Sequence, residues 1–395
     1  MPKVRGPVLP FKNAEADLSG KTERDLVFLK ERLISQLLEQ GFTLEGGRLC
    51  LSDENKATLR GAHAKACNFL RERSKKNLAS SEDKLLSSIA DGSEIDPAHI
   101  SPRLIEVKAD SWEELLFRYA KLHWSIPVSA GYGRRIRFLV WDDFHDKLIG
   151  ILGLSDPVFS LKPRDTWMGC DKELRRKRLA NVMDAFVLGA VPPYSHLLGG
   201  KLVAMAVSSN EVREAFDLRY SQRNTLIGER HIGPLVLVTT TSALGRSSIY
   251  NRLKYKDRTV FHPVGFTSGS GEFPYLNGVY QDLLDLVSES RGPSAKNPKW
   301  GNGFRNRREV VLKALGLLGL PKDLIYHGVT REIFMVPLGI NAKEFLRAET
   351  DKFEAYDMPF SDLATWWKER WALPRLQRDQ RFFNFERESW RLWGH

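Results

Sequence analysis

The sequence is poor in the residues and runs that mark several large classes of protein. It has three cysteines among 395 residues, none of them at metal-ligand spacing, which argues against a disulfide scaffold and a cysteine-rich zinc site. No run approaches the roughly 18 apolar residues of a membrane span. The first residues also lack the apolar stretch of a secretory signal. We therefore expect a soluble, cytoplasmic protein without a membrane partner.

Two common kinds of catalytic centre also find little support. The nine histidines include no His-x-x-x-His pair, and the segment LGLSD (152–156) lacks the Gly-x-Ser-x-Gly pattern of a nucleophile elbow. A zinc hydrolase and a serine hydrolase are therefore set aside, and no residue is assigned as a metal ligand on this basis.

What the sequence does contain is apolar bulk and positive charge. Hydrophobic residues make up 42%, including ten Trp and twenty-one Phe, so the chain can bury a sizeable core. Lys and Arg number 60 against 49 Asp and Glu, which gives a net charge of +11. A balance of this kind indicates an anionic partner, and nucleic acid is the first to consider.

The positive charge is concentrated, as binding to a phosphate backbone requires. Segments 161–180, 291–313 and 365–395 carry +4, +6 and +3, which together exceed the net charge of the chain. The last of them also holds five of the ten tryptophans, which either dock the tail onto the body or stack on bases. We predict DNA as a partner, and the candidate nucleic-acid-binding residues are Arg134, Arg135, Arg164, Arg175, Arg176, Arg178, Lys296, Lys299, Arg305, Arg307 and Arg308.

The order of predicted elements favours an α/β (α+β) fold in three regions. Residues 1–105 form an N-terminal helical module, which begins with a helix capped by Thr22 and a small hairpin at 42–51. Strands alternate with helices in a core over 106–290, and 291–395 form a basic C-terminal α/β extension. We expect a basic helix over 172–186 and a long helix from about 197 to 220.

Two blocks of the core predict a phosphate site. In AVPPYSHLLGGKLVAMA (190–206) a glycine-bearing turn leads into a helix start, where free N–H groups and the helix dipole favour an anion. The second block, 239–256, presents Tyr250 on a short helix. The candidate phosphate-binding residues are His196, Gly199, Gly200, Lys201, Arg246, Ser247 and Asn251. The alternative is that the glycines only allow the helix to pack closely on the sheet.

Acidic residues offer a competing hypothesis. Asp142, Asp156 and Asp165 lie near strand ends, and two or three of them converging would hold Mg²⁺ for phosphodiester cleavage. Asp142 is also explained as part of a hairpin turn. Glu272 lies in a Gly/Ser-rich segment, which is either a mobile loop over a site or a linker. With Tyr250, these four acids are the candidate catalytic residues.

The order strand, Gly-Gly, helix, strand, tyrosine-bearing helix, strand resembles the acyl-CoA-dependent acetyltransferase superfamily. That resemblance implies an acetyltransferase-like mixed sheet, a CoA pyrophosphate at the loop before the helix, and Tyr250 as the acid that protonates the thiolate. The cofactor stays open between Mg²⁺ and acyl-CoA, and the fold also exists without the cofactor.

A set of longer motifs resembles the DruA family of the Druantia anti-phage defence systems, over nearly the whole chain. The motifs are GYGRRIRFLVWD (131–142), GLSDPVF (153–159), RDTWMG (164–169), VMDAFVLGAVPPYSHLLGGKL (182–202), TTTSALGRSSIYNRL (239–253), LIYHGVTREIFMVPL (324–338) and WWKERWALPR (366–375). The resemblance implies a role in defence against phage beside other components, including a helicase-like protein. It carries over no settled reaction. Where relatives often have a histidine after GFT, this chain reads GSGEFP, so Glu272 or His262 would have to replace it.

Overall fold

The computed structural model describes residues 22–53, 55–225, 229–290, 292–293 and 306–394. Its contacts divide the chain into two compact units. Unit 1 comprises Met1–Ala66 and Gly269–Val329, and unit 2 comprises Cys67–Ser268 and Thr330–His395. The three regions expected from the sequence stay a prediction, since a division by contacts does not test them.

Unit 1 is built on the helix and hairpin that the sequence predicts. Helix α1 (Glu23–Glu39) begins at Thr22, whose hydroxyl accepts from the Asp25 N–H while the Asp25 carboxylate accepts from Thr22 N, a capping box. Its leucines at three- and four-residue spacing are buried against the hairpin and two later helices. These elements are β1 (Phe42–Glu45), β2 (Arg48–Leu51), α9 (Tyr280–Ser290) and α10 (Arg307–Leu317).

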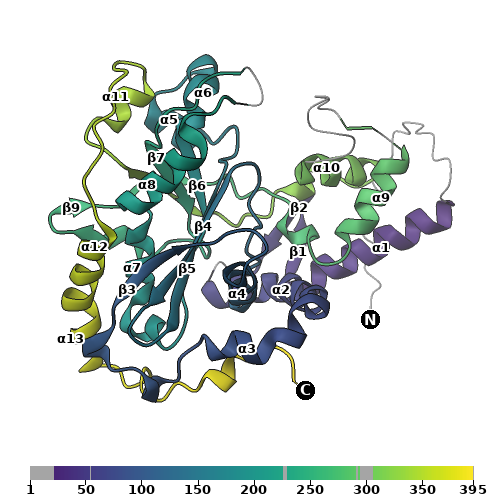
Figure 1. Cartoon of the computed structure of the whole chain (residues 1–395). Helices are drawn as coiled ribbons and strands as arrows, with labels where there is room; N and C mark the ends of the chain where they lie inside the picture. Colours follow the sequence, from purple (N-terminus) through teal and green to yellow (C-terminus); the bar gives the residue numbers. More distant parts are fainter. Residues whose placement is uncertain (1–21, 54, 226–228, 291, 294–305, 395) are drawn as a thin grey trace. The chain divides into compact units, whose positions relative to one another are not determined.

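Unit 2 contains a seven-stranded mixed sheet in the order β10-β11-β7-β6-β5-β4-β3 (Figure 1). Neighbouring strands run antiparallel except β6 and β7, which are parallel. The strands are β3 (Pro102–Glu106), β4 (Arg135–Asp142), β5 (Lys147–Ser155), β6 (Val182–Ala190), β7 (Leu237–Thr241), β10 (His262–Phe266) and β11 (Glu332–Pro337). The predicted α/β class with a mixed sheet is confirmed.

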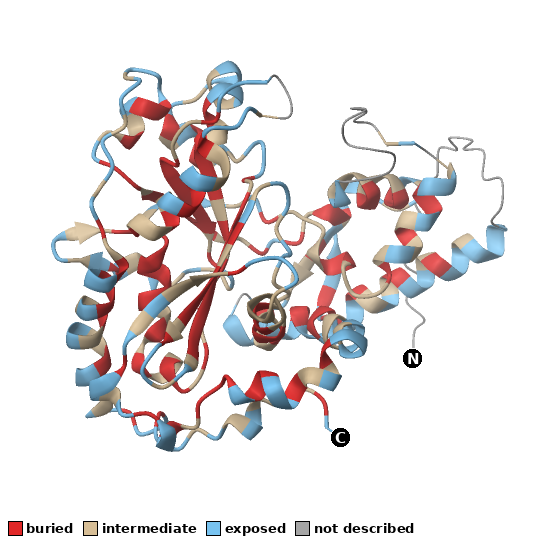
Figure 2. Cartoon of the chain, in the orientation of Figure 1, coloured by how far each residue is buried: buried red, intermediate tan, exposed pale blue. Residues whose placement is uncertain are grey.

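Helices cover both faces of this sheet, so its strands are apolar on both sides. In β11, Phe334 and Val336 face one core, and Ile333 and Met335 face another. Figure 2 shows that the inner strands of this sheet are largely buried. One face is covered by α7 (Gly199–Ala206), α8 (Asn210–Phe216) and α12 (Phe360–Trp367). The other is covered by α3 (Glu82–Ser87), α4 (Trp112–Ala120), α5 (Lys162–Met168) and α11 (Ala342–Leu346).

The remaining described elements lie at the edges of these layers. They are α2 (Lys56–Leu78), α6 (Lys172–Arg178), α13 (Leu373–Leu376), and a short hairpin of β8 (Lys254–Tyr255) and β9 (Arg258–Thr259). The division between the two units falls within α2. In the described part of the chain, no helix is both long and apolar enough to cross a membrane.

Three expected helices are wrong. The basic helix ends at Arg178, and residues 182–186 begin strand β6, because their side chains alternate between the two buried faces and pair with β5 and β7. The expected helix 197–220 is broken: α7 ends at Ala206, and Ser209 caps a new helix by accepting from the Val212 N–H. The expected helix 247–253 is only a 3-10 turn, Tyr250–Arg252.

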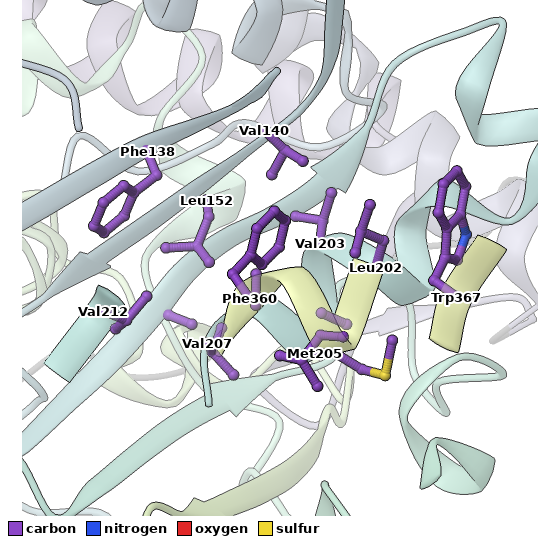
Figure 3. Close-up of a cluster of buried hydrophobic side chains, with 14 of the residues drawn as sticks. Phe138, Val140, Leu152, Leu202, Val203, Met205, Val207, Val212, Phe360 and Trp367 are labelled. Atoms are coloured by element: carbon purple, nitrogen blue, oxygen red, sulfur yellow. The ribbon is translucent and has the colours of Figure 1, made fainter. Parts of the chain in front are cut away.

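The C-terminal segment is part of the body of unit 2. Strand β11 lies between β10 and β7, and α12 packs on α7. In Figure 3, Trp367 of α12 lies beside Leu202 of α7. Docking of the tail by its tryptophans is confirmed for Trp367 and Trp393, which are buried.

Candidate functional site

Strands β6 and β7 are the one pair of neighbouring strands in this sheet, among those described, that run in the same direction. Pairing between them ends at Asp184 and Thr239, although β6 continues to Ala190. The register of β6 on β5 also shifts at Gly153, where Phe186 is an extra residue in β6. Bulges are common beside active sites, and ligands of open α/β sheets bind beyond the carboxyl ends of parallel strands. The start of α7, which follows β6, is therefore the place to look.

The two glycines at the start of α7 are fixed by close packing. Leu198 has a left-handed backbone (φ 59°), and a Cβ on Gly199 would lie 2.7 Å from the carbonyl oxygen of Tyr194. A Cβ on Gly200 would lie 3.3 Å from the Ile249 side chain. The two sequence blocks predicted to form a phosphate site therefore meet at Gly200 and Ile249.

Lys201 lies in this first turn and has a cation as its neighbour. Its Nζ is 4.4 Å from the centre of the Trp371 ring, and burial, together with the Arg370 charge, lowers the pKa of the Lys201 amine. Arg370 and Trp371 belong to the π-helical turn Lys368–Ala372 that follows α12. Among the described residues, no carboxylate lies within ion-pair distance of Lys201 or Arg370, so the two cations create an uncompensated positive potential.

More cations and aromatic rings extend this surface. Tyr255 of the β8–β9 hairpin contacts Trp366 of α12 edge to face, at 5.8 Å between ring centres. Arg252 and Lys254, just before Tyr255, are exposed. We call Lys201, Arg252, Lys254, Trp366, Arg370 and Trp371 the basic–aromatic surface. Asp257 and Glu369 are exposed acids of the same two segments.

The other residues predicted to bind phosphate have partners of their own. The backbone N–H of Ser247 and the Asn251 side chain donate to the buried Glu332 carboxylate, at 3.2 and 2.7 Å. They therefore shape the loop after β7. Arg246 is exposed. Burial, with Arg381 as a nearby charge, lowers the pKa of His196.

Tyr250, the predicted general acid, is packed among aromatic rings. It stacks on Phe261 with ring centres 4.5 Å apart and meets Phe334 edge to face at 5.3 Å. Burial raises the pKa of its phenol, which stays protonated at neutral pH. In the described structure Tyr250 is a packing residue of the core.

The candidate aspartates do not converge. Asp142 ends β4, where its carboxylate accepts from Ser101 N and Tyr194 Oη at 2.9 and 2.8 Å and contacts His145. Asp156 follows β5, whose end pairs with the start of β4, so Asp142 and Asp156 lie at opposite ends of the β4–β5 strand pair. Glu272 belongs to unit 1. Nowhere in the described part of the chain do three or more His, Cys, Asp and Glu gather into a possible metal site.

Several arginines predicted to bind nucleic acid are engaged inside unit 2. Arg134 donates to Asp156 at 2.7 Å, and Arg164 and Arg175 both donate to Asp165, at 2.7 and 3.0 Å. Asp165 and Arg175 also line an open cleft of about 510 Å³ with Lys162, Thr166 and Cys170.

The remaining predicted arginines differ in exposure. Arg178 has a side chain only 9% exposed, which lies over the Phe345 ring and donates to Asp351. Arg135, Arg176 and Arg307 are exposed, and Arg308 donates to the Ser270 hydroxyl. Lys296, Lys299 and Arg305 lie outside the described residues.

Two notable groups escaped the sequence-based search. Asp184, on β6, accepts from the Thr239 hydroxyl at 2.7 Å, and burial raises its pKa to about 6. The available signal was a single acid within the apolar run 182–190. Arg370 was the other, and its signal was the alternation of arginine and tryptophan in the tail.

Comparison with known proteins gives a clear match. The family model described as "Druantia protein DruA" matches residues 53–348. A protein of Escherichia coli (strain UMEA 4076-1), also called Druantia protein DruA, is 36% identical over 357 residues, which cover 90% of this chain and 88% of that protein. No solved structure matches the chain.

Proposed function

Because the chain belongs to the DruA family, we propose that it acts in bacterial defence against phage and binds DNA through the basic–aromatic surface of unit 2. The observation that carries the proposal is the pair of neighbouring cations Lys201, at the start of α7, and Arg370, in the turn after α12. Neither has a carboxylate partner among the described residues. DNA phosphate is the anion that the composition of the chain favours.

The surface combines the two interactions that nucleic acids use. DNA phosphates are attracted by the positive charges of Lys201, Arg370, Arg252 and Lys254. Each phosphate that is neutralised in this way releases condensed counterions. The exposed parts of Trp366 and Trp371 offer faces for unpaired bases. The positive end of the α7 dipole favours the same charge. We therefore propose a backbone-directed site that reads no particular sequence.

We further propose that unit 2 is an acetyltransferase-like core whose chemistry has been replaced. The seven-stranded mixed sheet, its single parallel pair and the helix after β6 support this fold. The packing of Tyr250 between Phe261 and Phe334 argues against a role in proton transfer. Other defence components, including a helicase-like protein, are the proposed protein partners, and the cytoplasm is the proposed location.

Fluorescence anisotropy with labelled duplex and single-stranded DNA tests the proposal. We expect Lys201→Ala and Arg370→Ala each to weaken binding and to reduce by about 1 the slope of log K against log salt, measured between 50 and 200 mM. Lys84→Ala is the matched control, because Lys84 is an exposed cation of α3, on the other face of the sheet, and its Nζ also lies over a tryptophan ring. An acetyl-CoA arm tests for retained cofactor binding.

The two surface variants leave the core intact, so their melting temperatures are expected to match the parent chain. Equal losses in Lys84→Ala and Lys201→Ala would show that the binding is diffuse and would contradict a defined surface. In cells that carry the defence system, the Lys201→Ala/Arg370→Ala double variant is expected to restore phage plating while the protein stays at normal abundance.

A further inference from the structure

A second, smaller cavity lies in unit 2 where β9 and the start of β10 meet the end of β11. It has a volume of about 210 Å³ and is lined by Ser208, Arg258, Thr259, Val260, His262, Pro337 and Tyr356. Besides Arg258, four of these residues carry a polar side chain that can contact a ligand. None of the seven is a carboxylate.

Positive charge in this cavity is not neutralised by the protein. Burial lowers the pKa of Arg258, and burial, together with Lys343 and Arg258, lowers the pKa of His262. No carboxylate of the described residues lies within ion-pair distance of Arg258 or His262. The nearby Asp357 is instead held by the Asn210 amide at 2.6 Å. An anion in the cavity would therefore gain from the Arg258 charge, and the His262 imidazole, which its lowered pKa keeps neutral at pH 7, can donate a hydrogen bond.

The guanidinium of Arg258 is held in a defined orientation. Its central carbon lies 3.9 Å from the centre of the Tyr356 ring, and one terminal nitrogen contacts the Met358 sulfur. Contact with the ring and with the Met358 sulfur limits the orientations of the guanidinium, and the N–H groups not engaged there can donate to a ligand. A planar fork held in this way suits two oxygens of one oxyanion, so the site is already organised for its ligand.

Ser208 further narrows the class of ligand that fits the cavity. Its side chain is buried, and its hydroxyl donates to the Met205 carbonyl oxygen at 2.8 Å, so the Ser208 oxygen offers only lone pairs to the cavity. A ligand that carries a hydroxyl hydrogen as well as anionic oxygens matches a donor fork beside an acceptor. Hydrogen phosphate has both, whereas sulfate has no hydrogen to donate at neutral pH.

We infer that the cavity bounded by Ser208, Arg258, His262 and Tyr356 is a binding site for a small phosphate group, free or as a monoester. The cavity volume corresponds to about seven water molecules at roughly 30 Å³ each, enough for a tetrahedral oxyanion with a small substituent. The Arg258 fork binds two phosphate oxygens, Tyr356 and His262 bound the group, and Ser208 accepts from its hydroxyl. The site is independent of the proposed DNA surface.

Thermal melting and calorimetry of the full chain test the inference. At pH 7 and constant ionic strength, we expect inorganic phosphate to raise the melting temperature more than sulfate does, and chloride to leave it unchanged. Glycerol phosphate in a parallel titration distinguishes a monoester ligand from the free ion. Arg258→Gln is expected to weaken phosphate binding by about tenfold or more, the loss expected for a charge-assisted pair of hydrogen bonds.

Control variants separate this site from its surroundings. Arg223→Gln removes an exposed cation that also lies over a tyrosine ring, Tyr220, and it is expected to leave the phosphate response unchanged. The Lys201→Ala/Arg370→Ala variant is expected to keep the response even if DNA binding is lost. If Arg258→Gln fails to fold, His262→Gln serves in the same titration. Equal stabilisation by phosphate and chloride, or an unchanged response in Arg258→Gln, would overturn the inference.

Discussion

At the scale of single residues, Asp184 makes the stability of the chain depend on pH. Burial raises its pKa to about 6, from an ordinary value near 3.8. The folded chain therefore holds a proton on this group that the unfolded chain has released, over the window from about pH 4 to 6. Stability from this group is present below pH 4 and is lost as pH rises through 6.

The Asp184→Asn variant removes that dependence and keeps an oxygen for the Thr239 hydroxyl. We expect its unfolding free energy, relative to the parent, to rise between pH 4 and 7 by up to about 3 kcal/mol and then level off. Urea unfolding at several pH values measures this difference. Asp143→Asn, an exposed acid paired with Arg103, is the control. A difference that stays flat across the window would contradict the prediction.

Contacts of single residues also explain why the sequence did not reveal which of the predicted DNA-binding arginines form ion pairs within unit 2. Arg164 and Asp165 are adjacent in sequence, yet nothing in the sequence says that their side chains pair inside a closed network with Arg175. Lys201 was recognisable because the glycines before it mark a helix start. Its neighbour Arg370 is 169 positions away, and only the packing of α12 on α7 brings the two together.

At the scale of elements, the loop after β7 depends on Glu332. Its buried carboxylate accepts from Ser247 N and from the Asn251 amide, while its backbone N–H donates to the Ser242 hydroxyl at 3.0 Å. Glu332→Ala removes the acceptor of two part-buried donors, and we expect a loss of about 1–3 kcal/mol in unfolding free energy. Glu332→Gln keeps one acceptor oxygen and is expected to lose less. Chemical denaturation of both variants measures the losses, and equal values would show that the carboxylate does not organise the loop.

Local signals explain which elements the sequence could predict. Helix α1 follows from its own cap and its leucine spacing, both of which are contained in seventeen residues. The start of strand β6, residues 182–186, could not be found in this way. The sequence there continues the helical pattern of α6, but pairing with β5 and β7 outweighs that local preference. The break at Ser208 and Ser209 was missed, because the apolar run around it also fits one long helix.

At the scale of the whole molecule, the tail stabilises the body it returns to. The Glu82 carboxylate accepts from the backbone N–H groups of Leu392 and Trp393 and from the Tyr119 hydroxyl, at 2.7, 3.2 and 2.9 Å. Trp393 fills the core beside α3 and α4. We expect Trp393→Ala to cost about 3–5 kcal/mol of unfolding free energy, and Trp393→Phe clearly less. Thermal unfolding checks both, and a loss below 1 kcal/mol in Trp393→Ala would contradict a structural role for the tail.

The position of β11 has a consequence for how the chain is made. Strands β10 and β7 both precede residues 269–329, and β11, which pairs with both of them, follows that segment. During synthesis the nascent chain therefore carries β7 with one unpaired edge while some sixty further residues are added at roughly 5–20 per second. For those seconds an apolar strand edge is open to other chains. The second half of unit 1 thus sets the interval during which a chaperone is most useful to this protein.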